Sequence, residues 1–160
     1  MYLNSLTEDN QKYVAEIRWK REYERFNNCE QYSISLERED NICEWRLCIK
    51  GNKETIYENW VFFLHIDLKN KYPFSPPRLK FMNEIIHPFI NSEGEFYIQI
   101  LEENWHPALT VEKIVPHILN FIDRFDDKLD NYPYENKKYS EMIKNNKDDF
   151  IKLVKESVLN

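Results

Sequence analysis

Cysteine carries the strongest side-chain nucleophile, the thiolate, and this chain of 160 residues has three of them. They are Cys29, Cys43 and Cys48, and no two have the C-x-x-C spacing of a zinc or redox site. Their odd number argues against a disulfide framework, so we expect free thiols, a reducing compartment and no bound metal. The two glycines, Gly51 and Gly94, are too few for a dinucleotide-binding or phosphate-binding glycine loop, so we expect no such cofactor.

Three short motifs lie close together in the middle of the chain. Residues 72–77 have the sequence Tyr-Pro-Phe-Ser-Pro-Pro, and residues 87–94 have the sequence His-Pro-Phe-Ile-Asn-Ser-Glu-Gly. Residues 98–101, Ile-Gln-Ile-Leu, are followed at 105–110 by Trp-His-Pro-Ala-Leu-Thr. Each motif alone has little specificity, so its meaning depends on the elements that position it.

The segment 7–27 predicts a helix, because apolar side chains recur at spacings of four, four and three residues. These side chains are Ala15, Trp19, Tyr23 and Phe26. The face opposite to them carries four cations: Arg18, Lys20, Arg21 and Arg25. A solvated helix face explains these cations about as well as a docking surface does.

Period-two alternation of apolar side chains predicts strands at 42–50 and 60–68, and shorter alternations predict strands at 32–36 and 78–81. Together they favour a four-stranded antiparallel meander, in which Gly51 and Asn52 turn the chain between the second and third strands. In this arrangement Cys43 is a small core hydrophobe, while Cys48 lies on the opposite face among polar residues.

After a turn-rich stretch from 83 to 107, the pattern becomes helical. Thr110 is suited to cap a helix that extends to about residue 125, and Pro116 within it predicts a kink or a late start. Two short helices are expected at 139–144 and 148–159, the second with a buried stripe: Phe150, Leu153, Val154 and Val158. The patterns predict an α+β fold in a single domain over 1–160.

In this order, after a helix and a four-strand meander with Trp45 in its second strand, the three motifs resemble the catalytic core of ubiquitin-conjugating enzymes. The resemblance covers nearly the whole chain. It implies the fold of that family: an N-terminal helix, a four-stranded antiparallel meander and C-terminal helices. It also implies the family's chemistry, in which one thiolate accepts ubiquitin or a related modifier from an activating enzyme. The thiolate then yields the modifier to a lysine or to a ligase's cysteine.

The family places this cysteine three residues after the glycine that corresponds to Gly94, and here that position is Tyr97. A phenol, with an ordinary pKa near ~10, is a poor substitute for a thiolate. The family's His-Pro-Asn, whose amide supports the oxyanion, is replaced by His87, Pro88 and Phe89. The resemblance therefore implies a degenerate site at Tyr97 and Phe89, which also includes His87, Pro88 and Gln99.

None of the three cysteines stands at the family's position. Four carboxylates near Tyr97 would also raise the pKa of a thiol placed there: Glu93, Glu95, Glu102 and Glu103. We therefore expect an inactive variant that binds ubiquitin or a ubiquitin-like modifier, a ligase or an active conjugating enzyme, and modulates transfer. Two alternatives stay open: an active transferase, of the ubiquitin or NEDD8 type, with an unorthodox nucleophile, and a scaffold or trafficking adaptor.

The family's ligase-contacting residues match this chain at Phe74, Pro107 and Ala108, with Arg18 and Arg21 as approximate equivalents on the first helix. A purely structural reason for Pro107 and Ala108 explains their presence equally well. The acid that orients an incoming lysine has no definite counterpart in the acidic stretch 126–133. Ser33 falls near the family's noncovalent ubiquitin-binding face.

The overall charge separates classes of partner. A formal net charge of −6 and a pI near 5.3 argue against a nucleic-acid partner, because phosphate contacts need a cationic surface. The chain has neither a long uncharged apolar run nor the regions of a signal peptide. We expect a soluble protein of the cytoplasm, the nucleus or both, with no membrane partner.

Overall fold

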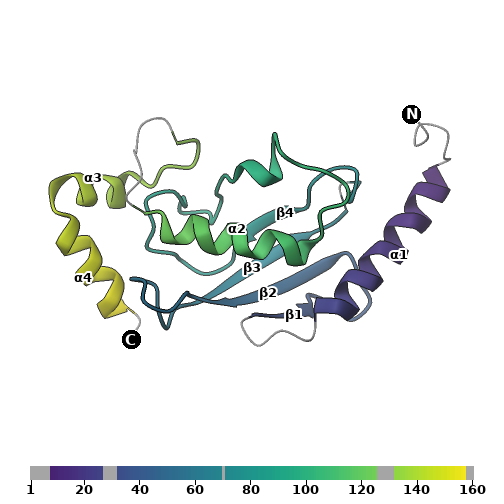
Figure 1. The fold of residues 1–160 in the computed structure, drawn as a ribbon, viewed down its shortest axis with the longest axis horizontal. Coiled ribbons are helices and arrows are strands. Elements are labelled where there is room, and N and C mark those ends of the chain that lie inside the picture. The colour runs from purple at the N-terminus through teal and green to yellow at the C-terminus, as the bar shows by residue number, and fades with distance from the viewer. Residues whose placement is uncertain (1–7, 27–31, 70, 126–131, 158–160) are drawn as a thin grey trace.

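The computed structural model of the protein describes residues 8–26, 32–69, 71–125 and 132–157. Helix α1 (Glu8–Phe26) precedes the strands β1 (Tyr32–Leu36), β2 (Glu44–Lys50), β3 (Val61–Asp67) and β4 (Arg78–Phe81). A short 3₁₀ helix η2 (Gln99–Leu101) is followed by the helices α2 (Val111–Asp123), α3 (Lys137–Asn145) and α4 (Lys147–Ser157). The strands form one antiparallel sheet in the order β1-β2-β3-β4, as Figure 1 shows. The predicted α+β architecture is confirmed.

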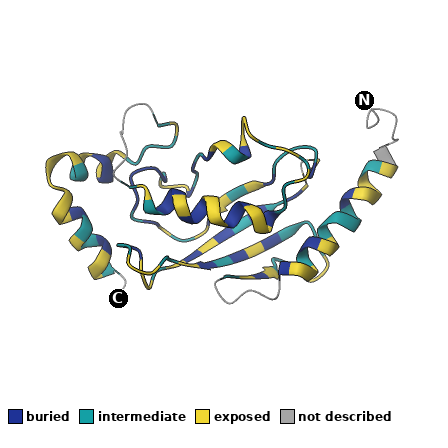
Figure 2. Cartoon of the chain, in the orientation of Figure 1, coloured by how far each residue is buried: buried dark blue, intermediate teal, exposed yellow. Residues whose placement is uncertain are grey.

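The sheet buries one face and leaves the other open. Alternate side chains of β2 and β3 are fully buried: Trp45, Leu47, Ile49, Phe62, Leu64 and Ile66. Helix α2 lies across this face and contributes its own apolar side chains to the same core (Figure 1). The side chains between them point outward, which gives the alternation of colours along the strands in Figure 2. Cys48 lies on this outer face, as expected, and is half-buried.

Cys43 differs from the prediction, because β2 begins one residue after it. Its thiol is half-buried at the margin of the core and donates a hydrogen bond to Oδ1 of Asn41, at 2.7 Å between Sγ and oxygen. Partial burial raises the pKa of this thiol; Lys69 opposes the effect, and Glu44 and Asp67 add to it. Cys43 is therefore less nucleophilic than an exposed cysteine.

The connection between β2 and β3 is a ten-residue loop over 51–60, one residue longer than the predicted strands leave, and Gly51 and Asn52 begin it. Gly51 donates its N–H to the carbonyl of Trp60, at 2.9 Å, at the base of this loop. A Cβ atom at Gly51 would lie 2.0 Å from the carbonyl oxygen of Tyr57, so the glycine is required by close backbone approach. Tyr57 itself is buried, and its hydroxyl donates to the carbonyl of Ile86, at 2.8 Å.

Helix α2 begins at Val111, and Thr110 caps it by accepting a hydrogen bond from the N–H of Lys113. The helix continues through Pro116, so the predicted late start is wrong. Pro116 faces solvent, where the carbonyl freed by its missing N–H is open to water.

At the C-terminal end, α4 buries Phe150 and Val154 as predicted, while Val158 lies outside the described residues.

Candidate functional site

The loop that follows β4 is held against the edge of the sheet. Phe81 donates its N–H to the carbonyl of Gly94, at 2.9 Å. Gly94 has a φ of +80°, and a Cβ atom there would lie 2.2 Å from the carbonyl oxygen of Phe81. Oδ1 of Asn91 accepts the N–H groups of Glu93 and Glu95, at 3.0 and 2.9 Å, which closes the turn. Tyr97, three residues beyond Gly94, therefore follows a rigidly held turn.

Tyr97 lies half-buried in an open hollow of about 510 Å³. Tyr132 donates its hydroxyl to the backbone carbonyl of Tyr97, and the two rings meet edge to face at 6.1 Å. The pKa of the Tyr97 phenol is raised above its ordinary value by partial loss of water, and further by the carboxylates of Glu103 and Glu102. The phenol is therefore neutral near pH 7 and a poor nucleophile.

Phe89 forms an apolar wall of the same hollow. It is buried, and its ring lies 4.5 Å from that of Tyr132 and 5.6 Å from that of His87. Tyr132 also stacks on Phe121 of α2, at 6.2 Å between ring centroids. The position where the resemblance implies an amide is therefore part of an aromatic cluster. The Phe89 side chain has no polar donor that could stabilise an oxyanion.

His87 holds this part of the chain against α2. It is fully buried, its Nδ1 accepts the N–H of Phe89 at 3.1 Å, and its Nε2 lies 3.1 Å from the carbonyl of Ile122. Burial lowers the pKa of His87 to about 3, although the Ile122 carbonyl favours the charged form. Near neutral pH the ring is uncharged, with the Nε2 proton donated to Ile122. This bonding makes His87 a positioning residue.

The remaining two predicted site residues flank the hollow. Pro88 is buried, and its carbonyl accepts the N–H of Asn136 at 2.8 Å, which links this loop to the residue preceding α3. Gln99 is the first residue of η2, is exposed, and lines the hollow together with Tyr97. No cysteine lines this hollow among the residues that the structure describes.

The candidate docking residues lie on two loops that are joined to each other. Nε1 of Trp105 donates to the carbonyl of Pro73 at 3.0 Å, and the ring of Trp105 lies 5.8 Å from that of Tyr72. Phe74 and Pro107 are half-buried on these loops, and Ala108 is exposed. The structure thus connects the 72–77 and 105–110 motifs through one tryptophan.

Glu22 ties both loops to α1. Its buried carboxylate accepts the hydroxyl of Tyr72 at 2.5 Å and the N–H of Val111 at 2.8 Å. The first N–H groups of a helix have no partner within it, so a carboxylate at the start of α2 is favourable. Arg18 pairs with Glu22 and also donates to the carbonyl of Leu109, at 2.8 Å.

These contacts correct the prediction that Arg18 belongs to an outward cationic face of α1. Its guanidinium is partly buried and bonds inward to Glu22, whereas Arg21 is exposed as expected. The sequence contained a sign of this arrangement, because Glu22 lies three residues after Trp19 and four before Phe26, on the buried side of the helix. No comparable periodicity in the sequence pointed to Tyr132.

Cys29 and the acids Asp126, Asp127 and Asp130 lie outside the described residues. Ser33 is exposed on the outer face of the sheet, opposite Cys48 in the register of β1 and β2.

In the described part of the chain, no cluster of His, Cys, Asp or Glu is arranged to hold a metal ion, and no helix is long and apolar enough to cross a membrane.

Comparison with known proteins identifies the family of this chain. The family described as "Ubiquitin-conjugating enzyme" matches residues 18–158. A curated relative, "Probable ubiquitin-conjugating enzyme E2 31" of Arabidopsis thaliana, is 42% identical over 85 residues, which are 53% of this chain and 55% of that protein. The alignment thus spans about half the length of that relative. The family match extends from α1 into the last residues of the chain, and the chain belongs to the ubiquitin-conjugating enzyme family.

Proposed function

We propose that this protein is a noncatalytic member of the family that binds partners of the ubiquitin pathway and modulates modifier transfer. The observation that carries the proposal is Tyr97 at the position of the family's cysteine. The two aromatic rings beside it, Phe89 and Tyr132, line the hollow with apolar surface. A phenol with a raised pKa offers neither the thiolate that accepts the modifier nor a good leaving group for the second transfer.

The loops that resemble the family's ligase surface support the binding half of the proposal. Phe74, Pro107 and Ala108 lie on loops joined by Trp105 and fixed to α1 through Glu22. An accessible aromatic ring beside small apolar residues is the kind of anchor on which protein interfaces are centred. These contacts do not depend on the residue at position 97, so binding and catalysis are separable in this fold.

The test is a charging reaction that contains the protein, activating enzyme, ATP and ubiquitin or another modifier from a panel that includes NEDD8. An active conjugating enzyme in parallel reactions serves as the positive control. We expect no thiol-reducible adduct on this chain with any modifier, and retained binding to a ligase or to an active conjugating enzyme in solution. A reducible adduct would contradict the proposal and favour an unorthodox nucleophile. Cys29→Ser, Cys43→Ser and Cys48→Ser variants would then locate that nucleophile.

A further inference from the structure

A second cavity lies beyond the edge strand β4, between the loop that follows this strand and the start of α3. This α3 cavity has a volume of about 710 Å³. Phe81 and Ile85 line it and are buried, so its floor is apolar. Tyr139 of α3 also lines it and is buried, which adds an aromatic wall. The cavity thus offers an apolar surface that a ligand can contact.

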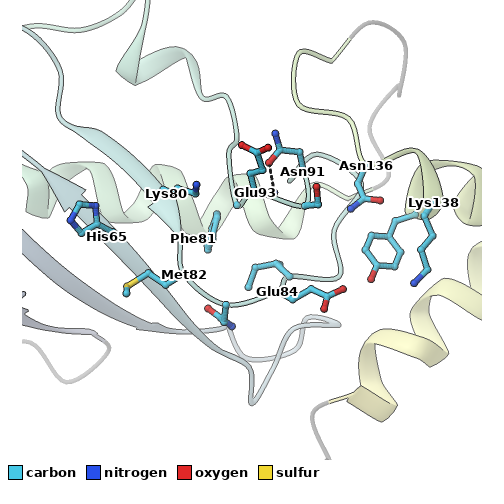
Figure 3. A pocket seen from close by; sticks show the side chains of 14 residues that line it. His65, Lys80, Phe81, Met82, Glu84, Asn91, Glu93, Asn136 and Lys138 are labelled. Atoms are coloured by element: carbon cyan, nitrogen blue, oxygen red, sulfur yellow. Dashed lines mark hydrogen bonds between the residues drawn. The ribbon is translucent and has the colours of Figure 1, made fainter.

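Two carboxylates flank the α3 cavity. Figure 3 shows Glu84 and Glu93 on opposite sides of the space. Both residues are exposed, and among the described residues neither forms an ion pair. Glu93 belongs to a closed turn, because its N–H donates to Oδ1 of Asn91 at 3.0 Å. The described part of the chain therefore leaves both negative charges open to a cation from outside.

The ring of Tyr139 connects Glu84 to α3. Burial raises the pKa of its phenol, Lys138 lowers it, and the nearby carboxylate of Glu84 raises it again. Lys138 is engaged with the face of this ring, with its Nζ 5.0 Å from the ring centroid. Asn136, which precedes α3, donates its Nδ2 to the carbonyl of Ile90 at 3.3 Å, so its Oδ1 remains as an acceptor. One side of the cavity thus combines a carboxylate, a hydroxyl, an amide oxygen and an aromatic ring.

A guanidinium group suits this combination better than an ammonium ion does. It is planar, so it stacks on an aromatic ring, and its fixed fork of N–H donors forms two parallel bonds with a carboxylate. The hydroxyl of Tyr139 and Oδ1 of Asn136 are further acceptors for the remaining donors. An anionic ligand is disfavoured here, because Glu84 and Glu93 would repel it.

The size and the sheet side of the cavity narrow the ligand further. A volume of about 710 Å³ exceeds what one side chain fills, so residues that flank an arginine in a polypeptide fit beside it. Toward the sheet the cavity reaches His65 and Lys80. Lys80 is exposed and would repel a cation, so the arginine belongs at the α3 end.

We propose that the α3 cavity binds an arginine side chain of a partner protein, with its guanidinium against Tyr139 and paired with Glu84. Glu93 attracts the same charge from the opposite side, and the aliphatic part of the arginine contacts Phe81 and Ile85. The groups that bind it lie on the loop after β4 and on α3, apart from the outer face of the sheet. The proposal is independent of whether Tyr97 has replaced a nucleophile.

The experiment titrates the ¹⁵N-labelled protein with a blocked pentapeptide that has one arginine between alanines, and with the same peptide carrying citrulline instead. Citrulline has nearly the shape of arginine without its charge. We expect only the arginine peptide to shift the amides of residues 83–94 and of the start of α3. A lysine peptide should bind about threefold more weakly or less tightly still, because an ammonium ion lacks the planar fork.

Three substitutions at exposed positions locate the charge. Glu84→Gln should weaken binding of the arginine peptide by about fivefold or more, because it removes the charge-assisted pair. Glu93→Gln should weaken it by about twofold, as expected for attraction without a direct pair. Glu141→Gln changes the same charge on α3 outside the cavity and is the control, with less than about 1.5-fold effect.

Several results would overturn the proposal. They are equal binding of the citrulline or lysine peptide, an equal effect of Glu84→Gln and Glu141→Gln, and the absence of amide shifts in the cavity. Shifts confined to the outer face of the sheet, around Ser33 and Cys48, would also contradict it. If free arginine bound as tightly as the peptide, the cavity would be a site for a small metabolite and the assignment to a partner protein would be wrong.

Discussion

In the function that we propose, Tyr97 and Phe89 remove two different contributions to catalysis from adjoining turns. Tyr97 replaces a thiolate, which is a strong nucleophile and a good leaving group, with a phenol whose pKa is raised by its surroundings. Phe89 replaces an amide donor with a buried ring packed against Tyr132 and His87. Because nucleophilic attack and stabilisation of the oxyanion are separate requirements, restoring one of them does not restore the other.

This separation predicts the behaviour of two variants in the charging reaction. Tyr97→Cys should form little thioester, since the carboxylates of Glu102 and Glu103 disfavour the thiolate and residue 89 supplies no amide donor. Tyr97→Cys with Phe89→Asn should discharge a modifier faster, by on the order of 10²-fold, which is the usual contribution of one oxyanion donor. Single-turnover transfer to free lysine measures this difference. Equal rates for the single and double variants would contradict the separate contribution of residue 89.

His87 gives a second prediction at this scale, for stability against pH. Its pKa falls from an ordinary 6.5 to about 3 in the folded protein, so over that interval the unfolded chain binds a proton that the folded chain does not. The stabilisation is fully present above pH 6.5 and is lost as the pH falls, by about 1.4 kcal/mol per pH unit. Between pH 7 and pH 5, this histidine should cost on the order of 2 kcal/mol of unfolding free energy.

The matched variant is His87→Gln, whose amide can donate to Ile122 and accept from Phe89 without taking up a proton. Urea unfolding at pH 5, 6 and 7 should give a shallower pH dependence for this variant than for the natural protein. The difference between the two slopes isolates the histidine from the carboxylates, which titrate in both proteins. Parallel curves would mean that His87 is protonated in the folded state as readily as in the unfolded chain.

At the scale of elements, Glu22 connects three segments that are far apart in sequence. One carboxylate binds the hydroxyl of Tyr72, the first N–H of α2 at Val111, and Arg18 on its own helix. Helix α1 is thereby fixed to the loops that carry Phe74 and Ala108. The position of a candidate docking surface therefore depends on a buried ionic contact as well as on apolar packing.

We predict that Glu22→Gln lowers the unfolding free energy by about 2–3 kcal/mol, because it removes the charge that compensates the partly buried Arg18. Glu24→Gln, at an exposed position of the same helix, is the control and should change stability by less than about 0.5 kcal/mol. Chemical denaturation at neutral pH measures both variants. A Glu22→Gln variant as stable as the Glu24→Gln control would show that the carboxylate is not needed to hold α1.

The elements themselves were predictable from local patterns, and the contacts between them were not. The period-two alternation of apolar side chains located all four strands, and β1 and β4 have the bounds that it predicted. The same patterns carry no information on contacts within loops, so the close approach of Gly51 to Tyr57 and the inward bonding of Arg18 were missed. Tyr132 joins the site only through tertiary packing on Phe89 and Phe121, which no spacing in the sequence records.

At the scale of the whole molecule, three surfaces occupy different parts of one fold. The hollow at Tyr97 lies between the loop after β4 and helix α2, while the joined docking loops adjoin α1 and the start of α2. The open outer face of the sheet is on the side that α2 does not cover (Figure 1). A change at one surface should therefore leave binding at the others intact, because separated sites contribute independently.

This independence predicts how the protein acts on an active conjugating enzyme that uses the same ligase. Added in excess, the natural chain should compete for the ligase and slow modifier transfer in proportion to its occupancy. Phe74→Ala, which removes the aromatic anchor, should weaken competition by about tenfold or more, as expected for a central interface residue. Tyr97→Phe should compete as well as the natural chain, because its change lies in the hollow. Titrating each variant into a reconstituted transfer reaction measures its inhibition constant. If Tyr97→Phe lost competition while Phe74→Ala retained it, the ligase would be engaging the hollow at Tyr97 and the loops would serve only to hold the fold together.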